Sequence, residues 1–103
     1  MENQIVWVDM PVLDLDRAIE FYSAIFGTKV TKEQYGDCAF GLLPHAQTNV
    51  SGCLAVMPDR KPSADGPLVY FNAEGRIDEA VRAAKTFNVE VIDGNQSLFV
   101  QIG

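Results

Sequence analysis

The sequence predicts an α+β fold made of two βαβββ units, with a mixed sheet curved around a cleft and the helices on the outside. Residues 5–12 alternate apolar and other side chains, which is strand periodicity. Residues 15–26 place apolar side chains at helical spacing, and a glycine follows. The same order of elements restarts after residue 67. We therefore expect a pair of units, of which the second is incomplete at its C-terminal end.

Length and charge narrow the class of protein. The chain has 103 residues, enough for one small domain, and its hydrophobic fraction of 48% suits a packed core. The net charge of −6 offers no basic face, so we expect no nucleic-acid partner. We see neither an apolar run of the roughly 18 residues that span a bilayer nor a signal peptide. We therefore expect a cytoplasmic protein without membrane association.

The first strand and helix carry the clearest local signals. The even positions of residues 5–12 are aliphatic and should pack on a helix, whereas Trp7 and Asp9 face the other side. Asp14 suits a helix N-cap, because its carboxylate can accept from the first free amides. Gly27 should end the helix in the left-handed region.

Turn residues and periodicity place the remaining elements. A segment rich in proline, glycine and charge, residues 58–66, should link a first unit at 1–57 to a second at 67–103. We expect strands at 28–34, 38–43, 51–57, 68–72, 89–92 and 98–102, and a second helix with a stripe from Ile77 to Phe87 and a stop at Asn88.

The two units are related by a weak internal repeat. Phe26-Gly27 falls on Phe87-Asn88, a shift of 61 residues. By that period, the last strand of the second unit would lie at about residues 112–118, beyond Gly103. An open sheet edge would then remain at Leu98–Ile102, and such an edge attracts another strand. We therefore expect a homodimer through open sheet edges.

Residues 12–27 resemble a known family. The run VLDLDRAIEFY followed by FG is similar to the vicinal oxygen chelate superfamily, which includes glyoxalase, bleomycin resistance proteins and extradiol dioxygenases, and residues 66–72 (GPLVYFN) resemble the second half of its small members. The matching residues are Val12, Leu13, Asp14, Leu15, Ala18, Ile19, Phe21, Tyr22, Phe26 and Gly27.

The resemblance implies where metal ligands would lie. Enzymes of this class take His or Gln from the first strand of each unit and Glu from the last. The first-strand position falls on Trp7, its repeat partner near Leu68, and the strand GCLAVMP holds no carboxylate. An indole cannot coordinate a divalent cation. We therefore expect no metal and no cofactor, which weakens the case for an enzyme.

The side of the first strand opposite the helix holds the candidate ligand site. Trp7 is either an aromatic floor for a planar or cationic ligand or a core tryptophan. Asp9 either orients a ligand amine or bonds to local amides. Alternation puts Tyr70 on the cleft side and Phe71 toward the helices. The predicted ligand-binding residues, which could equally just fill the interior, are Trp7, Asp9, Phe40, Met57 and Tyr70.

The lone histidine and the two cysteines give no catalytic constellation. His45 has no acidic residue or cysteine near it in sequence, so we expect a solvated loop histidine. Cys38 and Cys53 should be buried thiols acting as small hydrophobic side chains. They would be cross-strand neighbours if their strands form a hairpin around residues 44–49.

Three functional hypotheses remain. The first is a metal-free protein that holds a small apolar or aromatic, possibly cationic, molecule in a cleft without breaking a bond. The second is a lyase or isomerase of the same superfamily, with a metal or acid–base group supplied partly by another subunit. The third is a decayed or truncated domain without a ligand.

Overall fold

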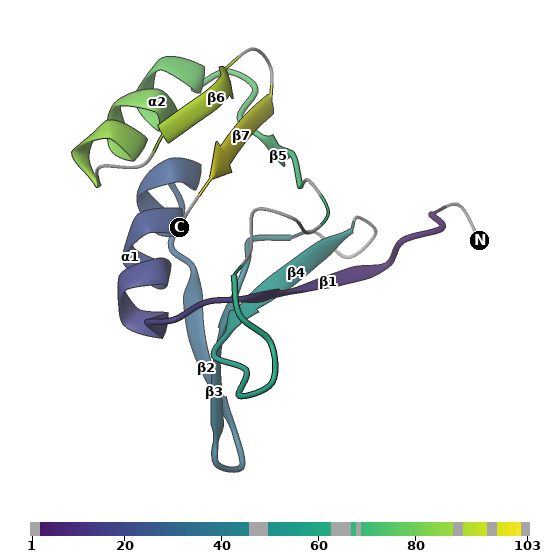
Figure 1. Ribbon diagram of the computed structural model, residues 1–103. Coiled ribbons are helices and arrows are strands. Elements are labelled where there is room, and N and C mark those ends of the chain that lie inside the picture. The colour runs from purple at the N-terminus through teal and green to yellow at the C-terminus, as the bar shows by residue number, and fades with distance from the viewer. Residues whose placement is uncertain are drawn as a thin grey trace.

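A computed structural model describes residues 3–45, 50–62, 67, 69–87, 90–94 and 97–101, the last two ranges by their backbone. The order of strands and helices along the chain follows the expected repeat (Figure 1). The elements are β1 (Trp7–Pro11), α1 (Leu15–Phe26), β2 (Thr31–Tyr35), β3 (Cys38–Leu42), β4 (Ser51–Ala55), β5 (Phe71–Asn72), α2 (Ile77–Thr86), β6 (Glu90–Gly94) and β7 (Ser97–Gln101).

The described strands form two sheets. The first has the order β1-β4-β3-β2; β1 runs parallel to β4, and the other neighbours are antiparallel. The second has the order β5-β7-β6 and is antiparallel. These mixed strands with two helices confirm the predicted α+β class, although the strands lie in two open sheets and not in one continuous sheet.

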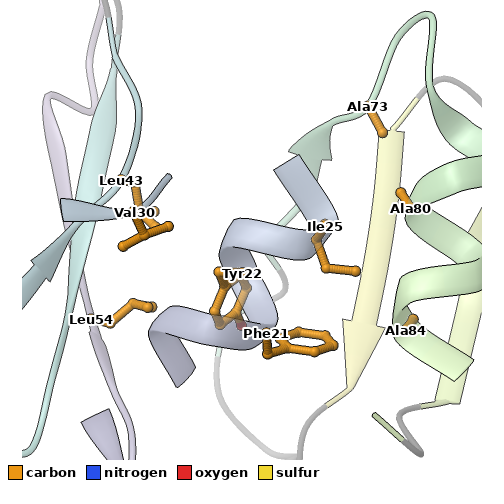
Figure 2. Close-up of a cluster of buried hydrophobic side chains, with 9 residues drawn as sticks. All are labelled: Phe21, Tyr22, Ile25, Val30, Leu43, Leu54, Ala73, Ala80 and Ala84. Carbon is orange, nitrogen blue, oxygen red and sulfur yellow. The ribbon is translucent and has the colours of Figure 1, made fainter. Parts of the chain in front are cut away.

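Helix α1 lies between the first sheet and the second unit (Figures 1 and 2). Its buried side chains Phe21 and Ile25 meet the second unit, where Phe21 is edge-on to Phe87 with ring centroids 5.4 Å apart. On its other side, Leu54 from β4 is fully buried. Removing this apolar surface from water is the main stabilising term of the fold. The buried core residues are Phe21, Tyr22, Ile25, Val30, Leu43, Leu54, Ala73, Ala80 and Ala84.

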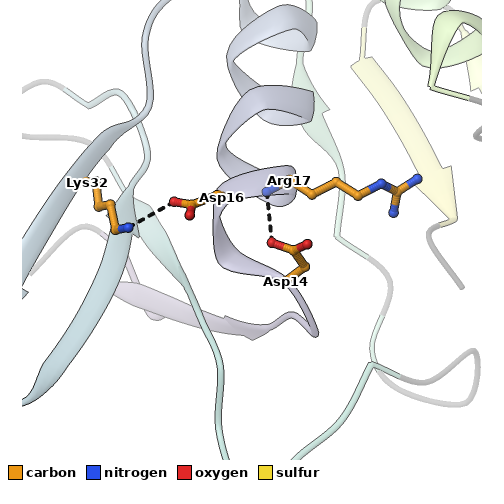
Figure 3. Close-up of polar contacts among 4 residues, drawn as sticks. All are labelled: Asp14, Asp16, Arg17 and Lys32. Carbon is orange, nitrogen blue, oxygen red and sulfur yellow. Dashed lines mark hydrogen bonds and ion pairs between the residues drawn. The ribbon is translucent and has the colours of Figure 1, made fainter.

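Both predicted helix signals of α1 are confirmed. The Asp14 carboxylate accepts a hydrogen bond of 3.1 Å from the Arg17 backbone amide, which satisfies one of the free N–H groups of the first turn (Figure 3). Gly27 has φ +66°, and its N–H donates to the Ser23 carbonyl. Asp16 is not a cap; its carboxylate forms an exposed ion pair with Lys32 of β2 at 2.9 Å.

The second unit departs from expectation in its sheet order. β7 is the central strand, so the prediction of an open edge at Leu98–Ile102 is wrong over the described part of that range. The reason is that β5 pairs directly with β7, whereas in the first unit β4 separates β1 from β3. β5 is also shorter than the expected strand over 68–72, and the expected stop at Asn88 lies outside the described residues.

Candidate functional site on the open face of the first sheet

The first sheet has two unlike faces. One face packs on α1, and Met10, Val12 and Leu54 on that side belong to or pack against the core. The pairing registers place the alternate residues on the opposite side, which we call the open face. The open face consists of Trp7, Asp9 and Pro11 of β1, Ser51, Cys53 and Ala55 of β4, Cys38, Phe40 and Leu42 of β3, and Thr31, Glu33 and Tyr35 of β2.

Asp9 is the centre of a small polar network on this face. Its Oδ1 accepts a hydrogen bond of 2.9 Å from Trp7 Nε1 and one of 3.2 Å from Cys53 Sγ. The parallel register brings these groups together, because Asp9 lies opposite Cys53. Trp7 remains 42% exposed, so it is not a fully buried core tryptophan. The network therefore fixes the polar edge of the indole and leaves much of the side chain accessible.

His45 and Ser51 lie beside this network. The His45 ring is edge-on to Trp7, with centroids 6.2 Å apart and an interplanar angle of 86°. His45 Nδ1 is 3.4 Å from the Leu43 carbonyl, and the Ser51 hydroxyl donates to the Pro44 carbonyl at 3.2 Å. His45 is exposed, as expected, but its contact with Trp7 was not predicted. The two residues are 38 positions apart in the chain, and no motif in the sequence indicates that their rings meet.

The Cys53 thiol is held in its protonated form. Burial is the main cause that raises the pKa of Cys53 to about 11, and the hydrogen bond and negative charge of Asp9 act in the same direction. A hydrogen bond with Trp7 lowers this pKa and only partly offsets them. Since the thiolate is the nucleophilic form, Cys53 is a poor nucleophile near neutral pH. It acts instead as a donor that orients Asp9.

The predicted site residues do not all come together. Trp7 and Asp9 are in contact, and Phe40 lies on the same face, opposite Ala55. Met57 lies beyond β4 in a bridge with Arg60. Tyr70 is 57% exposed and precedes β5 of the other sheet, whereas Phe71 turns to the core and contacts the Tyr22 and Phe26 rings.

The expectations for the cysteines are partly wrong. Cys53 is buried, but Cys38 is exposed, because it begins β3 next to the turn at the tip of the β2–β3 hairpin. β3 and β4 are antiparallel, as the expected hairpin requires, yet Leu42 and not Cys38 lies opposite Cys53. Both thiols are free.

The described residues show neither a metal-binding cluster nor a membrane-spanning helix. In that part of the chain, no three His, Cys, Asp or Glu side chains gather closely enough to hold a metal ion. No helix within the same residues combines the length and apolar character needed to cross a membrane.

A family comparison connects this geometry with known proteins. The model of the glyoxalase/bleomycin resistance protein/dioxygenase superfamily matches residues 4–99. The chain belongs to this superfamily. No curated protein and no solved structure matches the chain closely enough to count as related. Membership of the glyoxalase superfamily confirms the resemblance found in residues 12–27 and leaves the ligand to be argued from the site.

Proposed function

We propose that this protein binds a small apolar or aromatic molecule on the open face of the first sheet, against Trp7. The observation that carries the proposal is the tethered, 42% exposed indole. A large aromatic side chain loses much of its contact with water when a ligand covers it, and its ring adds a geometric preference for another aromatic ring. The bond from Nε1 to Asp9 means that little side-chain freedom is lost on binding.

The surroundings of Trp7 support a binding surface. Phe40 and Leu42 are half-buried on the same face and extend the apolar floor across β3. Polar groups in small numbers, such as Asp9 and His45, are the usual means by which such floors orient a ligand. Met57 and Tyr70 are also predicted to contact the ligand. They lie outside β1–β4, so they would contact it only from neighbouring segments of the chain.

The same residues give weaker support to the alternative that the protein is a lyase or isomerase. A lyase or isomerase needs acid–base groups that converge on a substrate. Asp9 and His45 both lie against Trp7, but the Cys53 pKa of about 11 leaves that thiol protonated at neutral pH. Chemistry at this site would therefore run through Asp9 or His45, with further groups supplied by another subunit.

The binding proposal is tested through the intrinsic fluorescence of Trp7, the single tryptophan of the chain. We expect a planar aromatic ligand to quench this emission with saturation at micromolar concentration. Leu42→Ala should weaken the binding, because Leu42 lies on the same face opposite Cys53, which in turn pairs with Asp9. Tyr35→Ala is the matched control, since Tyr35 is 83% exposed at the far edge of the sheet. Absence of saturable quenching across a broad aromatic library would contradict the proposal.

We also propose that the protein forms a homodimer through its open sheet edges. β1 is an edge strand, and it is preceded by the exposed apolar residues Ile5 and Val6. An edge strand with exposed apolar side chains is a template for another chain. Pro11 has no N–H and would confine such pairing to the start of the strand.

Sedimentation velocity tests the dimer. We expect Ile5→Lys to shift a dimer toward monomer. Leu13→Lys is the control, because Leu13 is exposed to a similar extent (68% against 63%) but lies beyond the end of β1. A monomeric wild-type protein at micromolar concentration would rule out the dimer.

A further inference from the structure

We infer that the open face selects a positively charged aromatic ligand and that the Asp9 carboxylate, by binding the positive charge, is responsible for this selectivity. The inference rests on the binding role proposed above and names the ligand class. Charge is distributed unequally over the two faces of the first sheet. Asp9 and Glu33 are the charged residues on the open face, which holds no lysine or arginine among its strand residues. A ligand on this face therefore meets negative charge alone from the sheet.

The one basic residue within the four strands is directed away from the open face. Lys32 lies on β2 between Thr31 and Glu33, so its side chain projects on the side of α1. There its ammonium group pairs with Asp16 of the helix at 2.9 Å (Figure 3). The basic charge of the sheet is thus engaged with α1.

Asp9 is held in a geometry that leaves it able to accept from a ligand. The hydrogen bonds from Trp7 Nε1 and Cys53 Sγ both end on Oδ1. Asp9 is exposed, and a carboxylate offers about four lone-pair sites over its two oxygens. Both donors are neutral, so they orient the carboxylate without cancelling its charge. Oδ2 can therefore accept from a cationic donor in a charge-assisted hydrogen bond.

Trp7 adds an aromatic contact next to that charge. An indole is the side chain that attracts cations best through its ring face. Since its Nε1 bonds directly to Asp9, ring and carboxylate are adjacent, and one planar cation can contact both. A neutral ligand of the same shape would gain the stacking but lose the cation–π and charge-assisted terms. We expect the cation to bind at least about tenfold more tightly than its neutral isostere.

The test uses two probes of nearly identical shape: 4-aminoquinoline, which is a cation with N–H donors at neutral pH, and 1-aminonaphthalene, which is neutral. The readout is the single indole N–H cross-peak of Trp7 in ¹H–¹⁵N spectra. Wild-type protein should bind the cation at least about tenfold more tightly, and Asp9→Asn should reduce this ratio to about threefold, the part that the cation–π contact with Trp7 still supplies. Glu33→Gln is the matched control: it removes the same charge from the same face, but from β2, at the edge opposite β1, and should retain the preference. Asp9→Glu keeps the negative charge and should therefore retain part of the preference for the cation that Asp9→Asn loses.

The outcomes separate this inference from the binding proposal. Equal affinity for both probes, or a preference that is undiminished by Asp9→Asn in a protein with a native spectrum, would overturn the charge selection and leave the binding role intact. No shift of the Trp7 peak with either probe would contradict the binding role itself. Tighter binding of the neutral probe would also overturn the inference.

Discussion

Gly27 should be far more sensitive to substitution than its backbone conformation alone predicts. A Cβ at this position would lie 2.5 Å from Arg76 Cζ, which is closer than side chains approach one another. Arg76 belongs to the second unit, and its guanidinium donates to the Ala24 and Ile25 carbonyls at 3.2 and 3.4 Å. These are free carbonyls at the end of α1, where positive charge also meets the negative end of the helix dipole. Gly27→Ala would displace this link between the units.

The expected magnitude has two parts. A left-handed φ of +66° costs an alanine about 1 kcal/mol relative to glycine. Loss of the two Arg76 hydrogen bonds, which are long and only half-buried, adds about 1–2 kcal/mol. Gly27→Ala should therefore lower the free energy of unfolding by about 2–3 kcal/mol. Gly36→Ala is the matched control at φ +60°, with nothing within 4 Å of the new methyl, and should cost only about 1 kcal/mol.

A double-mutant cycle measured by urea denaturation isolates the contact. In an Arg76→Ala background, the cost of Gly27→Ala should fall to about 1 kcal/mol, because no guanidinium remains to be displaced. Equal costs for Gly27→Ala and Gly36→Ala would exclude a contribution from the Arg76 contact. An excess cost of Gly27→Ala that persists without Arg76 would exclude it as well.

Three other predictions concern thiol chemistry, alkaline stability and the start of α1. Iodoacetamide at neutral pH should alkylate the exposed Cys38 and spare the buried Cys53. Labelling of Cys53 should rise only as the pH approaches the pKa of this thiol, about 11. Fast labelling of both thiols in the folded protein would contradict this prediction. Burial raises the pKa of Tyr22 from 10.0 to about 12, so the stability gained from keeping this phenol neutral is present below pH 10 and lost between pH 10 and 12. The unfolding free energy of Tyr22→Phe should therefore decline less over that range than that of the wild-type protein. Parallel declines in the two proteins would disprove this prediction. Asp14→Ala should cost about 1 kcal/mol as a lost cap, whereas Asp16→Ala should cost at most a few tenths because its ion pair is exposed; urea melts showing the reverse order would refute the assignment.

Local chemistry explains why the sequence predicts the first unit well. Asp14 and Gly27 act within one turn of α1, so their roles follow from residues next to them in the chain. The alternation of residues 5–12 also predicts correctly that Met10 faces the core and Trp7 does not. It is wrong for Val6, which precedes β1 and is 67% exposed. These features depend on side-chain periodicity, which the sequence displays directly.

Contacts across the sheet could not be predicted in the same way. The bond between Asp9 and Cys53 depends on the parallel register of β1 and β4, and a register shift by one residue would turn Cys53 to the other face. The contact of His45 with Trp7 depends on the path of the chain after β3. The second sheet differs from expectation because β5 pairs directly with β7, a choice between alternative neighbours that the strand pattern leaves open.

We propose that a ligand of this glyoxalase-superfamily protein lies on the open face against Trp7. A crystal structure of the protein with protonated 4-aminoquinoline is the test. We predict ligand density in contact with the indole ring, with Asp9 beside it and Leu42 on the same face. Ordered ligand elsewhere, with Trp7 covered by the protein's own side chains, would contradict this proposal.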